Sequence, residues 1–70
     1  MYYPGQRPPY RVMDTTSGTV VWSGSDRTAA SANFENSVES FRQAGIKTYI
    51  ILQGLDEKDI YRRMRERMIV

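Results

Sequence analysis

The chain has 70 residues and a formal net charge of +2, and it contains no cysteine and no histidine. One domain of this size rarely gains more than about 3–5 kcal/mol of net stability from its core. Disulfides, Ser-His-Asp triads and Cys-His pairs are excluded, and transition-metal sites are disfavoured because they draw on Cys or His. We therefore expect no enzyme, no cofactor and no metal, which leaves self-association as the remaining support for a small core.

The chain also lacks the signals that direct proteins to membranes or out of the cell. No apolar run reaches the ~18 residues of a membrane span, and the first residues lack the basic and apolar regions of a signal peptide. We expect no membrane contact and a cytoplasmic location. All three prolines fall in residues 1–9, which predicts an arm that either lays Tyr2 or Tyr3 on the domain or frays. Residues 10–70 are expected to form one domain.

Residues 10–13 and 19–23 are rich in β-branched and aromatic side chains, which predicts two strands. Between them, Asp14 can accept hydrogen bonds from the backbone ahead of it, and Gly18 can adopt the positive φ of a tight turn. This pattern predicts a β-hairpin.

A helix is expected to follow, with Ser25 or Asp26 as its N-cap and an end near residue 44. Its apolar face is marked by three- and four-residue steps, at Ala30, Phe34, Ser37, Val38 and Phe41. Gly45 is the expected C′ residue, because glycine readily adopts the left-handed conformation that ends a helix.

The most apolar run is residues 46–53, which lie between two glycines and predict a third strand. Alternation sends Ile46, Thr48, Ile50 and Leu52 toward the helix. We expect Val12, Val20 and Trp22 of the hairpin on that same face. The second face would then carry more apolar side chains than a solvated face needs, namely Met13, Val21, Tyr49 and Ile51.

Residues 56–68 predict a second helix. Asp56 would be the N-cap with Asp59 at N3, and Leu55 and Ile60 have the spacing of a hydrophobic staple. Its apolar stripe would be Ile60, Met64 and Met68, with Tyr61 at the edge. This helix either covers the second face of its own sheet or packs on a partner.

The predicted fold is α+β, in the order β-β-α-β-α. The three strands form an antiparallel sheet in the order 2-1-3, packed on an amphipathic helix, with a C-terminal helix in addition. Residues 46–53 would then form an edge strand that is exposed for pairing with another chain.

We expect a non-enzymatic protein-interaction module that works through the second sheet face, the sheet edge or the second helix, most simply as a homodimer. No family motif is present. In size and missing chemistry the chain resembles compact inhibitors and adaptors encoded by phages and mobile elements, which implies a regulatory or inhibitory role. The candidate interface residues are Met13, Val21, Tyr49, Ile51, Tyr61, Met64 and Met68.

The alternative is a nucleic-acid-binding module, because arginines on one helix can hold phosphates. The arginines concerned are Arg62, Arg63, Arg65 and Arg67, with Arg7 and Arg11 as further candidates. Acidic residues share the same segment, and Arg62 and Glu66 have the spacing of a helical ion pair. A solvated helix surface therefore has more support than a nucleic-acid site. A third hypothesis is a carboxylate-based enzyme. It would need Asp and Glu side chains to meet in one pocket, and the sequence pattern predicts no such pocket.

Overall fold

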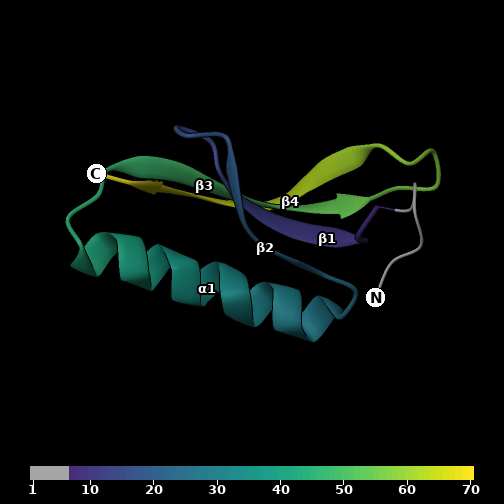
Figure 1. Ribbon diagram of the computed structural model, residues 1–70, viewed down its shortest axis with the longest axis horizontal. Coiled ribbons are helices and arrows are strands. Elements are labelled where there is room, and N and C mark those ends of the chain that lie inside the picture. Colours follow the sequence, from purple (N-terminus) through teal and green to yellow (C-terminus); the bar gives the residue numbers. More distant parts are fainter. Residues whose placement is uncertain (1–6) are drawn as a thin grey trace.

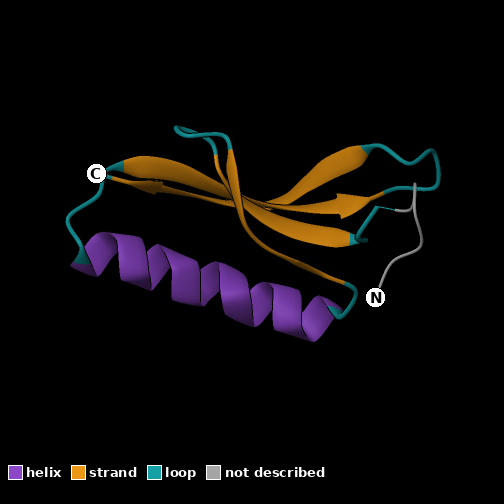
Figure 2. Ribbon diagram, viewed as in Figure 1, coloured by secondary structure: helices purple, strands orange, loops and turns teal. Residues whose placement is uncertain are grey.

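The computed structural model describes residues 7–70, so the predicted contacts of Tyr2 and Tyr3 lie outside the described residues. The elements are β1 (Tyr10–Asp14), β2 (Thr19–Gly24), α1 (Arg27–Gln43), β3 (Thr48–Leu55) and β4 (Tyr61–Ile69). The strands form one antiparallel sheet in the order β2-β1-β3-β4. The helix runs along one face of this sheet (Figures 1 and 2). The class is therefore α+β, as predicted.

The hairpin and the first helix are confirmed, together with the local signals that predicted them. Gly18 has φ 73° and closes the turn between β1 and β2. The Asp26 carboxylate accepts a hydrogen bond from the Thr28 amide at 2.9 Å and caps α1. Gly45, with φ 72°, follows the C-cap Ala44.

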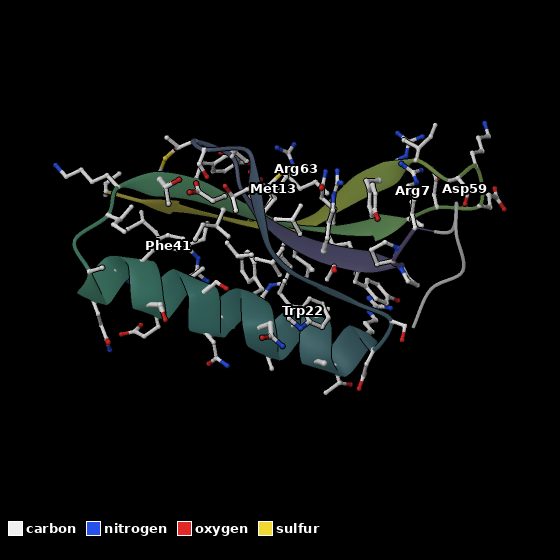
Figure 3. All side chains as sticks on the ribbon, in the orientation of Figure 1. Arg7, Met13, Trp22, Phe41, Asp59 and Arg63 are labelled. Atoms are coloured by element: carbon white, nitrogen blue, oxygen red, sulfur yellow. The ribbon has the colours of Figure 1, made fainter. Side chains whose placement is uncertain are left out.

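The core lies between α1 and the sheet. Figure 3 shows Trp22 and Phe41 reaching into this layer from β2 and α1, where they pack around the buried side chains. Apolar burial at roughly 25 cal/mol per Å² is the main force that holds the helix on the sheet. The buried side chains of this core are Val12, Ala30, Phe34, Val38, Ile50, Leu52 and Ile69.

The predicted second helix is wrong, because residues 61–69 form β4 and pair with β3. The Asp56 carboxylate does accept from backbone amides, those of Lys58 at 2.8 Å and Ile60 at 3.0 Å. Here those bonds close a hairpin turn, in which Asp59 has φ 59°. Aspartate stabilises turns and helix starts by the same kind of bond, so the local signal suited both.

The sheet consequently has four strands rather than three, and β3 lies in its interior rather than at an edge. The strand pattern of β4 is hidden because two of its helix-side positions are arginines. Arg65 and Arg67 form ion pairs with Glu35 of α1, at 3.0 and 3.6 Å. The guanidinium of Arg65 also lies 4.8 Å from the centre of the Phe34 ring. Charged side chains therefore occupy places where an apolar alternation would have predicted a strand.

The hairpin differs from expectation at one residue. Val12 pairs with Trp22 but Met13 pairs with Val20, so Val21 is an extra residue in a β-bulge. A one-residue shift moves side chains to the opposite face. Val20 therefore lies on the face of Met13, and its predicted position toward the helix is wrong.

Candidate functional site

The sheet face opposite α1, called the open face below, has no helix over it in the part of the chain that the structure describes (Figure 1). Figure 3 shows Met13 and Arg63 on this side, away from the helix. Cross-strand partners share a face, so the pairing registers identify its members. Its members within the strands are Arg11, Met13, Val20, Ser23, Tyr49, Ile51, Gln53, Leu55, Tyr61, Arg63, Glu66 and Met68.

One end of the open face is apolar. Val20, Met13 and Ile51 lie side by side across β2, β1 and β3 in successive register pairs. Tyr49 and Met68 form the next pair along β3 and β4. Met68 is 62% exposed and Val20 43% exposed, whereas Ile51 is only 8% exposed. These five residues, called the apolar end below, thus combine one buried centre with exposed apolar neighbours.

The other end of the open face carries arginines stacked on an aromatic ring. The guanidinium carbon of Arg11 lies 3.7 Å from the centre of the Tyr61 ring, and that of Arg7 lies 4.9 Å from it. Gln53 accepts a hydrogen bond from Nε of Arg11 at 2.6 Å. The Tyr61 hydroxyl donates to the carbonyl of Pro8 at 2.7 Å. Arg7, Arg11, Gln53 and Tyr61 are called the cationic end below.

Arg63 connects the two ends. It lies opposite Gln53 in the register, yet its guanidinium donates to the Tyr49 hydroxyl at 2.9 Å. Ile51 occupies the position between Gln53 and Tyr49 on the same face. The Arg63 side chain therefore passes over Ile51. This accounts for the low exposure of Ile51 on a face that has no helix over it within residues 7–70.

The structure brings five of the seven candidate interface residues onto the open face and leaves two elsewhere. Val21 is the bulge residue of the β2 edge. Met64 is the extra residue of a second bulge, in β4. Its Sδ would lie 2.7 Å from a Cβ added at Gly54, next to the Tyr10 ring, so it packs on the helix side.

The four arginines of the nucleic-acid alternative point to different places. Arg65 and Arg67 lie on the helix side with Glu35. Arg62 forms an ion pair with Asp56 at 2.8 Å in the β3–β4 turn. The fourth, Arg63, lies on the open face, 3.4 Å from Glu66. A strand sends successive side chains to opposite faces, so these arginines form no single patch.

Two carboxylates have lowered pKa values, and both stabilise turns. A hydrogen bond from the Thr48 hydroxyl is the main cause that lowers the pKa of Asp14, and Ser17 and the Thr16 amide add to it. The hydrogen bond from Arg62 is the main cause that lowers the pKa of Asp56. Each carboxylate is held both by backbone amides of its own turn and by a side chain of a neighbouring strand, Thr48 for Asp14 and Arg62 for Asp56. The arrangement therefore suits structural roles rather than proton transfer.

Residues 7–70 hold no group of three or more acidic side chains placed to bind a metal ion. None of the helices in this part of the chain is both long and apolar enough to cross a membrane. No protein-family model, curated protein or solved structure was found to match the chain.

Sequence reasoning placed Gln53 on this face by alternation but missed its contact with Arg11, and it missed Val20 and Glu66 as members of the open face. The alternation of β2 assigns Val20 to the helix side unless the bulge is known. The hydrogen bond between Gln53 and Arg11 gave no local signal, because the two residues are 42 positions apart in the sequence. Glu66 was missed because the sequence predicted a helix where the structure has β4.

Proposed function

We propose that the protein is a small, non-enzymatic interaction module of the adaptor or inhibitor type that binds a protein partner through the open face. The observation that carries the proposal is the apolar end, where Met68 and Val20 are exposed beside Met13 and Tyr49. Contiguous exposed apolar side chains on an uncovered sheet face are typical of protein-binding surfaces.

The two sheet edges have less support as the contact surface. Both carry a β-bulge, β2 at Val21 and β4 at Met64. The β4 edge also carries five charged residues within Tyr61–Ile69. Bulges and charges are the devices by which natural proteins prevent pairing at sheet edges. The open face lacks such protection at its apolar end.

The inventory of side chains supports a non-enzymatic role. The chain contains no cysteine or histidine. The two carboxylates with lowered pKa values, Asp14 and Asp56, accept hydrogen bonds that stabilise turns. The cytoplasmic location expected from the sequence stays a prediction.

Site-specific photocrosslinking tests the proposal. Benzoylphenylalanine would replace Met68 on the open face and, as the matched control, Asn36, which is exposed on α1. In cells that naturally produce the protein, we expect protein adducts from position 68 and few from position 36. Equal adduct yields at both positions, or none at position 68, would contradict a docking role for the open face.

The homodimer expected from the sequence is tested separately by light scattering. A mass of two chains that becomes one chain in Met68→Asp would identify the second copy as the partner. Met68 is suited to this test because its high exposure means that the aspartate costs the monomer little. Ile51 is unsuitable, because a charge at its buried position would destabilise the monomer itself.

Nucleic-acid binding stays a second candidate because Arg7 and Arg11 lie over Tyr61. Against it, each arginine of β4 already has a carboxylate partner. Affinity for an oligonucleotide would have to fall steeply with salt. Absence of binding to single- and double-stranded oligonucleotides at low salt would exclude this function.

A further inference from the structure

The charge of the open face restricts what can cover it. Among residues 7–70, this face carries three arginines, Arg7, Arg11 and Arg63, against one carboxylate, Glu66. Arg63 and Glu66 pair with each other at 3.4 Å. The uncompensated positive charge is therefore that of Arg7 and Arg11, at the cationic end.

Arg11 is held in a position that suits a carboxylate. Its Nε donates to Gln53 at 2.6 Å, and its guanidinium carbon lies over the Tyr61 ring, 3.7 Å from the ring centre. One of five guanidinium donors is thus used, and the terminal nitrogens have no carboxylate partner among the described residues. An arginine fixed by such contacts loses little side-chain entropy when it binds an anion.

A second copy of the chain fits this surface poorly. If two open faces met with their ends aligned, Arg7 and Arg11 would lie against the same residues of the copy, and like charges oppose association. If the copy were reversed, the cationic end would lie on the apolar end, which includes Met13 and Met68, and guanidinium groups would be desolvated without partners.

A nucleic acid also fits poorly, because its phosphates repeat along the whole strand. Tyr61 pairs with Leu55 at the end of β3, so the β3–β4 turn with Asp56, Glu57 and Asp59 adjoins the cationic end. On the other side of the cationic end lies the apolar end. A partner with a few carboxylates at one point, followed by apolar side chains, matches the surface in both charge and polarity.

Resting on the proposed function, we infer that the partner is a protein segment in which acidic residues adjoin apolar ones. Its carboxylates bind Arg11 and Arg7 at the cationic end. Its apolar side chains pack on Met13, Val20 and Met68 at the apolar end.

The test is a titration of the ¹⁵N-labelled full chain, followed by NMR, with three probes. The first is a synthetic capped peptide with three glutamates followed by three leucines. The second has lysines in place of the glutamates, and the third is a twelve-residue oligothymidine. We expect the acidic peptide to shift amide signals of β1, β3 and β4 around Arg11 and Met13, with little effect on α1, and the lysine peptide to bind far more weakly.

Two matched variants assign the contact. Arg11→Gln should weaken the acidic peptide about tenfold, since a charged hydrogen-bond pair is lost. Arg27→Gln removes an exposed arginine at the start of α1, away from the open face, and should leave the affinity unchanged. Equal weakening by both variants would reduce the effect to net charge and overturn the assignment.

The remaining outcomes separate this inference from the proposed function. Tighter binding of oligothymidine than of the acidic peptide, sensitive to Arg11→Gln, would overturn the inference in favour of nucleic acid. Equal binding of the acidic and lysine peptides would overturn the charge argument. If no probe binds but position 68 still forms protein adducts, the docking role stands and the acidic partner is wrong.

Discussion

Replacing Asp14 by asparagine should expose how much one buried carboxylate contributes to this fold. Asp14 is 8% exposed and ends β1, where it accepts hydrogen bonds from the Thr48 hydroxyl, the Ser17 hydroxyl and the Thr16 amide. Thr48 is the first residue of β3. The carboxylate therefore connects the β1–β2 turn to the central strand, 34 residues away.

The expected cost follows from the number and type of these bonds. Hydrogen bonds to a charged acceptor contribute about 1.5–3 kcal/mol each, and neutral ones about 0.5–1.5 kcal/mol. An asparagine side chain keeps the shape of aspartate but loses the charge, and one carboxylate oxygen becomes an amide donor. Asp14→Asn should lower the free energy of unfolding by about 2–3 kcal/mol at pH 7, which is a large part of the ~3–5 kcal/mol available to so small a domain.

The effect should also depend on pH, with a defined sign. The pKa of Asp14 is lower in the folded chain than in the unfolded one, where an aspartate has a pKa of about 3.9. Its contribution is therefore full above that value and is lost as the pH falls through the folded pKa. The stability difference between the wild type and Asp14→Asn should shrink when the pH is lowered from 7 toward 2.

Urea denaturation followed by Trp22 fluorescence, at several pH values, measures both effects. The matched control is Asp26→Asn, because asparagine caps helices about as well as aspartate, and it should change stability by less than about 0.5 kcal/mol. If Asp14→Asn costs no more than this control, or if its cost does not fall with pH, the Asp14 network does not connect the turn to β3 as described.

Three further predictions concern other parts of the fold. Phe34→Ala, at a fully buried position, should cost about 3–5 kcal/mol and leave the chain largely unfolded by circular dichroism at 25 °C; a folded variant with a high melting temperature would contradict the central place of Phe34 in the core. Glu35→Gln removes two half-exposed ion pairs with Arg65 and Arg67 and should cost less than about 1 kcal/mol, a cost that shrinks in 1 M salt; a large, salt-independent loss in urea denaturation would mean that these pairs are buried. Gly18→Ala forces a side chain into φ 73° and should cost about 1 kcal/mol in thermal denaturation, although a Cβ meets no neighbour there; an unchanged melting temperature would argue against a strained turn.

The elements with strong local signals were predictable from sequence. The β1–β2 hairpin depends on Asp14 and Gly18, and α1 depends on Asp26, Gly45 and an apolar face that repeats every three or four residues. In each case the residues that decide the conformation lie within a few positions of one another, so the signal is complete in the local sequence. The same holds for the existence of the third strand, although its bounds are Thr48–Leu55 rather than residues 46–53.

The conformation of the C-terminal segment, residues 56–69, was decided by tertiary structure. Residues 61–69 have a helix-like spacing of Met64 and Met68 and a cap-like aspartate, but the unpaired edge of β3 and the carboxylate of Glu35 make a strand the better solution. A strand satisfies the backbone groups of β3 and places Arg65 and Arg67 beside Glu35. Those partners are distant in sequence, so no local window contains the competing interactions.

The candidate site, too, was predictable only in part from the local sequence. The sequence alone determined that the catalytic inventory is nearly empty and that one sheet face has surplus apolar residues, because composition and alternation are local properties. Only the tertiary structure decided that no helix within residues 7–70 covers this face, that the bulge at Val21 brings Val20 onto it, and that Arg7 and Arg11 lie over Tyr61. Each of these depends on register between strands, which is set by backbone pairing across the whole sheet rather than by any one segment.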